Sequence, residues 1–371
     1  MRILFLTSSM HAGGAERVAS TLANAWASRG DEVILMPTFS GGGHCFYELA
    51  PRIQLVYLTS VASKLTPFFG GRIARLFALR SFIRSTQPDV IVSFLSNVNI
   101  AAVIACVGMR IPVAVCERSD PFVMPVSRLL RCARAITYPL ATTLVVQTEA
   151  VARKYLSAFF PLARVRVVPN PAPQHIVNIH SNFNLNKQKR LLCVGRLAIE
   201  KQFDQLIDVF ARLTTRHVNW TLRIAGEGPL RSALQQQVVN LNLQSRVEFL
   251  GAVSDIGKEL AHADAFALTS AYEGFPNALL EAMAVGVPCV TFDCPSGPRE
   301  MSENGRVALL VPANDGQALE SALDQLMSSD DARRDLGARA RQSVIERYSL
   351  TKVLAQWDTM FDELTVKRQE R

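Results

Sequence analysis

Residues 273–281 read Glu-Gly-Phe-Pro-Asn-Ala-Leu-Leu-Glu, and they join a predicted strand to a predicted helix. The apolar run of residues 264–269 predicts a buried strand, and the good helix formers of residues 278–285 predict a helix. Pro276 stands where this helix would begin, and Gly286 stands where it would end. The segment is therefore expected to fold as strand, tight loop and helix.

Two carboxylates bracket this loop, because Glu273 lies on it and Glu281 lies within the helix that follows. The first turn of a helix offers unpaired backbone N–H groups and the positive end of the helix dipole, which suit a phosphate. A carboxylate on each side of such an anion site can hold hydroxyls, one set from a sugar and the other from a ribose. The pattern predicts a sugar-nucleotide site, and its alternative is the solvated face of an ordinary helix.

With Gly274-Phe275-Pro276 between them, Glu273 and Glu281 resemble the Glu-x-seven-Glu signature of the retaining glycosyltransferases of family four. The resemblance covers nearly the whole chain. It implies an α/β protein with the GT-B fold, in which two Rossmann-like domains face each other across a deep cleft. The residues expected to bind the donor are Glu281, Gly274, Phe275, Pro276, Asn277, Ala278, Leu279, Gly226 and Val253.

The chain of 371 residues is long enough for two domains of ordinary size. A run of Pro, Asn and Ala at residues 169–173 breaks regular structure, and a polar stretch follows it. We expect an N-terminal acceptor-binding domain over residues 1–172 and a linker over 173–188. A nucleotide-sugar-binding domain is expected over 189–348, with a C-terminal helix over 349–371 that crosses back to the first domain.

A second anion-binding pattern follows the predicted strand at residues 190–194. Arg196 and Lys201 flank one loop just before an amphipathic helix. Arg grips a phosphate through two N–H groups and Lys supplies a point charge, so together they can clamp a diphosphate. In the family resembled, the matching pair neutralises the nucleotide phosphates as the leaving group departs, which makes Arg196, Lys201 and Glu273 the expected catalytic residues. The alternative is a pair of surface cations.

Two places in the first half are expected to serve the acceptor. Gly13-Gly14 at a predicted helix start can let a phosphate or sugar approach the backbone, although a plain turn also explains them. Glu117-Arg118 follow a predicted strand over residues 111–116, at the edge where α/β proteins bind ligands. Many family members have a histidine near this point, so a catalytic role here is an open question, and a salt bridge across the loop is the alternative.

Positive charge is concentrated in the first half. Residues 1–180 hold 18 Lys and Arg against 8 Asp and Glu, a net charge of +10, whereas the remainder has a net charge of −2. Residues 49–88 and 121–148 contain no acidic residue and mix basic with apolar side chains, which suits an anionic membrane surface. The basic side chains on which this rests are Lys64, Arg72, Arg75, Arg80, Arg84, Arg128, Arg131 and Arg134, the first five lying among Phe68, Phe69, Leu76, Phe77, Phe82 and Ile83. Core helices with snorkelling arginines are the alternative, and nucleic acid is disfavoured because no binding module is recognisable.

Three absent sequence patterns exclude other classes of protein. The seven cysteines are scattered without a Cys-x-x-Cys pair, which favours a reducing cytoplasm over disulfides or a zinc site. The absence of Gly-x-Gly-x-x-Gly after the first strand counts against an NAD enzyme. No run approaches the ~18 apolar residues of a membrane span, so the chain is expected to be cytoplasmic and peripheral on the inner face of the membrane.

The last motif is Asp-Cys-Pro-Ser-Gly-Pro-Arg-Glu at residues 293–300. It resembles the subgroup that extends lipid-diphosphate-linked oligosaccharides for surface polysaccharides, although its Pro and Gly also simply shape a loop. We therefore expect retaining transfer of a sugar from a UDP-sugar to a lipid-linked glycan, without cofactor or metal, since no Asp-x-Asp motif is present. The alternatives are a GDP-sugar donor, a GT-B epimerase or phosphorylase, and a non-catalytic sugar-nucleotide-binding subunit.

Overall fold

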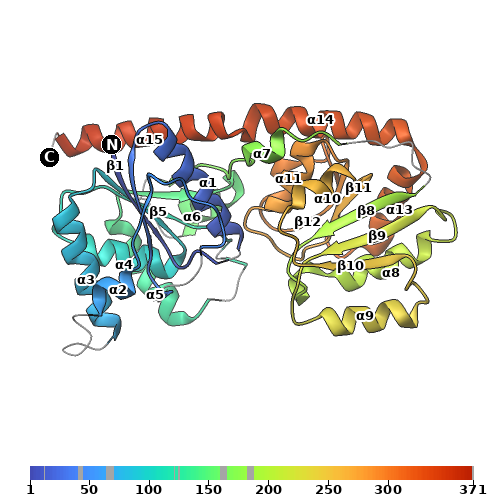
Figure 1. The fold of residues 1–371 in the computed structure, drawn as a ribbon, viewed down its shortest axis with the longest axis horizontal. Coiled ribbons are helices and arrows are strands. Elements are labelled where there is room, and N and C mark those ends of the chain that lie inside the picture. Colours follow the sequence, from blue (N-terminus) through green and yellow to red (C-terminus); the bar gives the residue numbers. More distant parts are fainter. Residues whose placement is uncertain are drawn as a thin grey trace. The chain divides into compact units, whose positions relative to one another are not determined.

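The structure is a computed structural model that describes residues 1–11, 13–40, 45–63, 71–120, 122–123, 126–158, 165–181 and 188–369. Its contacts divide the chain into two compact units. Unit 1 consists of Met1–Pro171 and Val353–Arg371, and unit 2 consists of Ala172–Lys352. Each unit is a parallel sheet with helices packed on both faces (Figure 1). The expected α/β architecture of two Rossmann-like domains is confirmed.

The sheet of unit 1 has the strand order β3-β2-β1-β4-β5-β6-β7, and every neighbouring pair is parallel. Residues 3–6 of its first strand along the chain are fully buried, as expected where helices cover both faces of a parallel sheet. The strand order reverses between β1 and β4, and such a switch point is where α/β folds bind ligands. The strands are β1 Arg2–Thr7, β2 Glu32–Pro37, β3 Gln54–Leu55, β4 Val90–Phe94, β5 Val113–Cys116, β6 Thr143–Val146 and β7 Val165–Val167.

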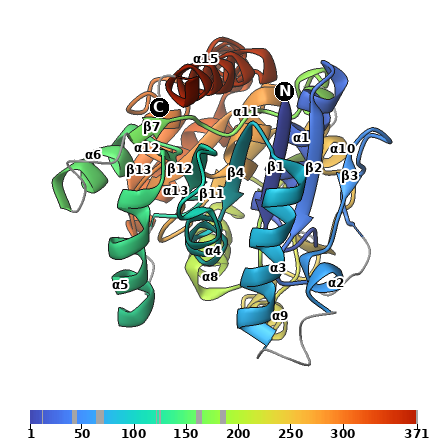
Figure 2. The same cartoon turned by 90° about the vertical axis from the view of Figure 1, so that its left-hand side faces the viewer.

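The helices of unit 1 form two layers. Trp26 on α1 packs against Trp357 and Phe361 on α15, with ring centroids 5.5 Å apart in both pairs, so α1 and α15 share one face of the sheet. Side chains of α3, α4 and α6 cover the other face, and Figure 2 shows α3 and α4 in front of the strands with α15 above them. The helices are α1 Gly14–Ser28, α2 Leu58–Ala62, α3 Gly71–Thr86, α4 Ser96–Cys106, α5 Arg128–Thr137, η1 Tyr138–Leu140, α6 Glu149–Ala158 and α15 Leu350–Gln369.

The sheet of unit 2 has the strand order β10-β9-β8-β11-β12-β13, again with parallel neighbours. Its switch point lies between β8 and β11. One core packs α8, α9 and α13 on the sheet, and the other packs α7, α10, α11 and α14. The strands are β8 Lys189–Val194, β9 Trp220–Ala225, β10 Val247–Gly251, β11 Ala265–Leu268, β12 Cys289–Asp293 and β13 Leu309–Pro312. The helices are α7 Gln174–Val177, η2 Ile199–Lys201, α8 Phe203–Leu213, α9 Arg231–Asn240, α10 Ile256–Ala261, α11 Asn277–Val285, α12 Pro298–Met301, α13 Gly316–Ser328 and α14 Asp330–Tyr348.

The boundary between the compact units follows Pro171. The segment expected to be the linker holds the short helix α7, whose Ile176 is fully buried in a core of unit 2. The sequence analysis did not predict this helix, which burial of an apolar side chain stabilises within a polar stretch.

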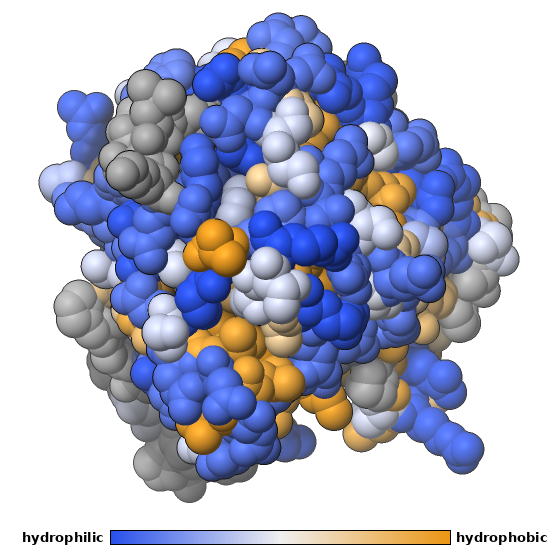
Figure 3. Space-filling view, turned by 90° about the vertical axis from the view of Figure 1, so that its right-hand side faces the viewer, coloured by the Kyte–Doolittle hydropathy of each residue, from blue (hydrophilic) through white to orange (hydrophobic). Residues whose placement is uncertain are grey.

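One face of unit 2 is mostly polar. Figure 3 turns the right-hand end of Figure 1 toward the viewer, and hydrophilic residues cover most of that face, while hydrophobic ones gather in its lower part. Such a mixture is typical of a protein surface in contact with water.

Candidate functional site

The segments that carry the sequence motifs of unit 2 meet at its switch point. β8 and β11 are neighbours in the sheet. The loop with Arg196 and Lys201 follows β8, and the loop with Glu273 follows β11. Because both strands run in the same direction, both loops lie at the same edge of the sheet, where α/β proteins form their ligand crevices.

Lys201 and Glu273 form an ion pair at this edge. The Lys201 Nζ lies 2.6 Å from the Glu273 Oε1, although the residues are 72 positions apart in the chain. The Ser270 Oγ donates to the same Oε1, also at 2.6 Å. The side chains of Lys201 and Glu273 are only 20% and 12% exposed. The two residues expected to meet a phosphate and a sugar are therefore held side by side.

The two loops are also tied through their backbones. The Thr269 Oγ1 donates to the carbonyl oxygen of Lys201 at 2.9 Å, and the Ala271 N–H donates to that of Glu200 at 2.8 Å. Sequence reasoning missed Thr269 and Ser270. Their position just after a buried strand, three or four residues before Glu273, is the signal that could have identified them.

Glycines bring a third loop, after β9, close to the Arg196 loop. Gly226 has a φ of +146°, and a Cβ added there would lie 1.9 Å from the carbonyl oxygen of Gly195. A Cβ on Gly228 would lie 2.4 Å from the carbonyl oxygen of Leu197. The Leu197 N–H donates to the Glu227 carbonyl at 2.9 Å across this contact. Gly226 thus allows the backbones to approach, which no side chain would permit.

The predicted strand, loop and helix around residue 276 are confirmed, with β11, a tight loop and α11 in that order. Gly286 ends α11 with a φ of +90°, as predicted. The Ser296 Oγ donates to the carbonyl oxygens of Glu273 and Gly274 at 2.8 and 3.1 Å, and so fixes the loop from the 293–300 segment. Gly297 packs its backbone on Pro276, where a Cβ would lie 2.6 Å from the Pro276 Cδ.

Several side chains of α11, and that of Phe275 in the loop before it, are buried. Phe275 and Leu279 are 7% and 0% exposed in the hydrophobic core, so only their backbone groups can reach a ligand. Glu281 is 2% exposed on the second turn of α11. Amides in the first turn of a helix lack intrahelical partners, and here they lie beside the Lys201–Glu273 pair. A loop, a helix start and a cation therefore lie together at one edge of the sheet, a combination that suits an anion.

Arg196 and Val253 follow β8 and β10 at the same edge of the sheet. The exposed Arg196 guanidinium makes no hydrogen bond or ion pair within the described parts of the chain. Val253, just after β10, is half-buried and packs against the core beside α11. Their expected contacts with a nucleotide sugar stay predictions.

In unit 1, Gly13 is the N-cap of α1, and the N–H of Gly13 donates to the Tyr47 hydroxyl at 3.1 Å. The Glu16 carboxylate lies over this helix start, because a Cβ on Gly13 would be 2.3 Å from the Glu16 Oε2. The Ser9 Oγ donates to the other Glu16 oxygen at 2.9 Å. An anion binding at Gly13 and Gly14 would therefore have to displace a carboxylate that already occupies this helix start.

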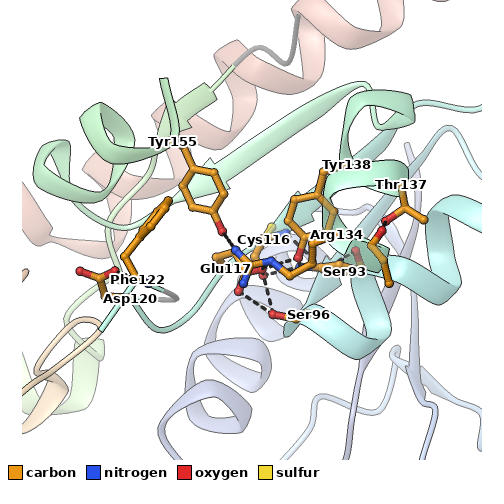
Figure 4. A network of polar contacts seen from close by, with 12 residues as sticks. Ser93, Ser96, Cys116, Glu117, Asp120, Phe122, Arg134, Thr137, Tyr138 and Tyr155 are labelled. Atoms are coloured by element: carbon orange, nitrogen blue, oxygen red, sulfur yellow. Dashed lines mark hydrogen bonds and ion pairs between the residues drawn. The ribbon is translucent and has the colours of Figure 1, made fainter. Parts of the chain in front are cut away.

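Glu117 lies in a closed polar network rather than in an open crevice. It is 2% exposed and accepts hydrogen bonds from the Ser96 Oγ at 2.9 and 3.0 Å and from the Tyr138 hydroxyl. The Arg134 Nε lies 3.4 Å from the Glu117 Oε1, and Arg134 also donates to the Tyr155 hydroxyl (Figure 4). Burial raises the pKa of Glu117, and the Arg134 charge with the hydroxyl donors opposes that shift.

This network bears on two expectations from the sequence. The salt-bridge alternative holds for Glu117, whose ion pair is formed with Arg134. Arg134 is only 8% exposed and cannot belong to a surface basic patch. Arg118 points elsewhere: its Nη1 donates to the Asn170 Oδ1 at 2.8 Å, and its guanidinium carbon lies 3.5 Å from the centroid of the Phe94 ring.

A hollow of about 350 Å³ lies at the opposite edge of the sheet of unit 2, at the amino ends of β8, β9 and β10. Its arginines are largely engaged, since the Arg223 Nε lies 2.9 Å from the Glu248 Oε2 and the Arg246 Nε donates to the Trp220 carbonyl at 2.8 Å. The predicted donor residues lie at the carboxyl ends of the strands and not in this hollow. It is lined by Gln188, Arg190, Thr221, Arg223, Gln244, Ser245, Arg246, Val247 and Glu248.

Known proteins share both the sequence pattern and the fold. Residues 13–171 match the family described as "Glycosyl transferase 4-like domain", and residues 177–343 match "Glycosyl transferases group 1". A relative from Campylobacter jejuni is 27% identical over 368 residues, covering 98% of this chain and 99% of its own length. It is the GalNAc-alpha-(1->4)-GalNAc-alpha-(1->3)-diNAcBac-PP-undecaprenol alpha-1,4-N-acetyl-D-galactosaminyltransferase. The amylovoran biosynthesis glycosyltransferase AmsD of Erwinia amylovora is 25% identical, covering 97% of this chain and 99% of its own.

Solved structures share the fold of this chain. Sucrose-phosphate synthase from Thermosynechococcus elongatus superposes with a TM-score of 0.84 at 18% identity, covering 99% of this chain and all of that one. HepE of Anabaena in complex with UDP superposes with a TM-score of 0.78 at 20% identity, covering 98% of this chain and all of that one. The two domain families match the chain one after the other, and each falls in one of the two Rossmann-like units. The chain belongs to the family-four glycosyltransferases of the GT-B fold.

Proposed function

We propose that this protein is a retaining, metal-independent glycosyltransferase that uses a UDP-sugar. It would move a hexose or N-acetylhexosamine to a polyprenyl-diphosphate-linked glycan during synthesis of a surface polysaccharide such as O-antigen, capsule or exopolysaccharide. The observation that carries the proposal is the Lys201–Glu273 pair, 2.6 Å apart beside the start of α11 at the switch point of unit 2.

The donor roles follow from the chemistry of that edge. Lys201 and Arg196 would meet the negative charge that grows on the departing diphosphate, together with amides of the first turn of α11. Glu273 would hold a hydroxyl of the transferred sugar, and the buried Glu281 would accept from the ribose hydroxyls. Because protein cations and amides supply the counter-charge, no metal is assigned to the site. The UDP bound to HepE supports a uridine nucleotide.

A front-face route fits the family and these groups. The bond between the anomeric carbon and the leaving phosphate oxygen breaks while the acceptor oxygen bonds to that carbon on the same face. The proton of the acceptor hydroxyl passes to the leaving phosphate, so UDP departs without an added base. The configuration at the anomeric carbon is retained.

The relatives support the acceptor class. The Campylobacter jejuni relative acts on a glycan joined to undecaprenol through a diphosphate, and AmsD acts in amylovoran biosynthesis. Both align with nearly the whole of this chain, so an acceptor of the same chemistry, a glycan on a lipid diphosphate, is the one we propose here.

Nucleotide selection and turnover test the donor assignment. UDP should raise the melting temperature, since a ligand at a hundred times its Kd stabilises by about 2.7 kcal/mol, whereas GDP and ADP should not. Incubation with UDP-glucose, UDP-galactose and their N-acetyl forms should release UDP slowly from at least one. Stabilisation by GDP alone would move the donor to GDP-sugars. Binding of UDP without any release or transfer would indicate a non-catalytic binding subunit.

We also propose that unit 1 binds the inner face of the cell membrane through α5. No helix in the described ranges is long and apolar enough to cross a bilayer. Leu129, Ile136 and Leu140 on α5 and η1 are 81%, 72% and 64% exposed, and Arg128 and Arg131 lie exposed beside them. Exposed apolar side chains with arginines suit an anionic headgroup layer. Elsewhere in the predicted basic patch, Arg80 donates to carbonyl oxygens of the chain, and Lys64, Phe68 and Phe69 lie outside the described residues.

Replacing Leu129 and Ile136 together by serine should lower the fraction of protein that floats with phosphatidylglycerol vesicles. Each buried aliphatic side chain contributes about 1.5–3 kcal/mol, so the partition coefficient should fall more than about tenfold. Val218 and Val239, which are 67% and 45% exposed in unit 2, provide the matched serine control. Equal flotation of the α5 variant and this control at physiological salt would contradict the assignment.

A further inference from the structure

Arg118 is a half-buried cation that the described residues leave without a carboxylate partner. It directly follows β5, and its guanidinium lies 3.5 Å from the ring centroid of Phe94, the last residue of β4. This places it at the carboxyl edge of the sheet of unit 1, one strand from the switch point between β1 and β4. Ligands of α/β proteins bind at such edges.

The hydrogen bonds of Arg118 use only part of its guanidinium. The Nη1 donates to the neutral Asn170 amide, while the Nε and Nη2 are shielded from solvent and have no hydrogen-bond partner among the described residues. The Nε and Nη2 together form the side-on edge of the guanidinium, which matches two oxygens of one phosphate or carboxylate. One complete bidentate edge is therefore unused.

The carboxylates nearest to Arg118 in sequence are engaged elsewhere. Glu117 accepts from Ser96 and Tyr138 and pairs with Arg134. Asp120 pairs with the Lys154 Nζ at 2.5 Å. Because the burial of Arg118 is not offset by a counter-charge, its pKa is lowered to about 10. Guanidinium N–H groups that are shielded from solvent without a partner are costly, so their presence calls for an explanation other than stability.

The backbone beside Arg118 shows a second unusual feature. Leu95, between Phe94 and α4, has a φ of +77° and a ψ of 141°, a conformation that side chains with a Cβ rarely adopt. Its N–H donates to the Cys116 carbonyl at 3.2 Å, which ties the ends of β4 and β5 together. Strained backbone of this kind concentrates at functional sites. The Glu117 network (Figure 4) also ties the end of β5 to Arg134 and Tyr138.

We propose that Arg118 binds a phosphate group of a substrate through its Nε and Nη2. The proposal rests on the proposed function only in that both substrates of that reaction carry a diphosphate, one on the nucleotide and one on the lipid. Because both atoms are shielded from solvent, phosphate binding requires that Arg118 or a neighbouring group moves. Arg118 is thus a binding residue for the charged part of a substrate, and Glu117 is a positioning residue that fixes the end of β5.

The test compares R118M with R110M. Arg110 is an exposed arginine at the amino end of the same segment, so the two variants lose the same charge at opposite edges of the sheet. Binding of UDP and of farnesyl diphosphate is measured by calorimetry, and melting temperatures are recorded for every variant. R118M should weaken one diphosphate probe by about tenfold or more, the ratio that 1.4 kcal/mol produces. R110M should bind both probes as the unaltered protein does.

The probe that is lost identifies the source of the phosphate. Loss of farnesyl diphosphate with UDP unchanged assigns Arg118 to the lipid acceptor, and the reverse result assigns it to the donor. R118M should melt at the same temperature as the unaltered protein or higher, because it removes shielded N–H groups that have no partner. R118K, which keeps the charge but loses the side-on edge, should bind the same probe with intermediate affinity.

Unchanged affinity of R118M for both probes would overturn the proposal. It would also be overturned if the unaltered protein bound neither UDP nor farnesyl diphosphate. A fall of several degrees in the melting temperature of R118M would also overturn it in favour of a structural role. The farnesyl diphosphate measurement involves no UDP-sugar, so a failed donor assignment leaves it readable. Conversely, sugar transfer by R118M with normal kinetics would sink this inference and leave the proposed function intact.

Discussion

Replacing Lys201 by methionine should lower the rate of sugar transfer by about a hundredfold to a thousandfold, the usual cost of removing one group that stabilises charge in a transition state. The Lys201 Nζ is the cation held at the switch point of unit 2, 2.6 Å from Glu273. Its charge matters most when the bond to the diphosphate breaks. The loss should therefore appear in kcat more than in the KM for the UDP-sugar, and steady-state kinetics separates the two.

The pairing with Glu273 sharpens this test. Lys258→Met is a matched control, because the Lys258 side chain is 80% exposed in the same unit. In a double-mutant cycle, K201M and E273Q should be strongly non-additive, since each removes the partner of the other. Additive losses, or a K201M enzyme as active as the K258M control, would rule out a catalytic role for the pair.

Replacing Glu281 by glutamine should raise the Kd for UDP by about 10- to 150-fold, because hydrogen bonds to a charged group contribute about 1.5–3 kcal/mol. Glu281 is 2% exposed, and glutamine keeps its volume, so the melting temperature without ligand should change little. Calorimetric titration with UDP measures the effect. E346Q, at an exposed position of α14, is the control.

The ribose contact itself can be isolated with 2′-deoxy-UDP. The unaltered protein should bind this analogue more weakly than UDP, and E281Q should bind the two nucleotides almost equally, because the carboxylate that distinguishes them is gone. An E281Q protein that still discriminates against the deoxy nucleotide would show that another group holds the ribose.

The local elements around the proposed site were predictable because their signals are local. Apolar residues 264–269 predict β11, Pro276 marks the start of α11 and Gly286 its end, and all three agree with the structure. These signals depend on strand burial and on the backbone preferences of Pro and Gly, which a short window of sequence contains. Helix α7 escaped prediction because one buried side chain, Ile176, stabilises it within a polar stretch.

The partners of charged residues were not predictable in the same way. Glu117 and Arg118 are adjacent in the chain, and the sequence left open whether they bind a ligand or form salt bridges. They point to different surroundings because successive residues at the end of a strand face opposite sides of the sheet. Glu117 consequently meets Arg134 and Tyr138, whereas Arg118 lies on Phe94 beside Asn170.

From the order of its residues alone, this chain could be recognised as two parallel α/β units with an anion-binding helix start after a buried strand, since hydrophobic periodicity and turn residues act over a few positions. The contact of Lys201 with Glu273, the enclosure of Glu117 and the unmatched charge of Arg118 became visible only in three dimensions. The physical reason is that an ion pair or a buried charge depends on which strands are neighbours. Strand order brings together residues as far apart as 72 positions, a distance over which the linear sequence carries no such signal.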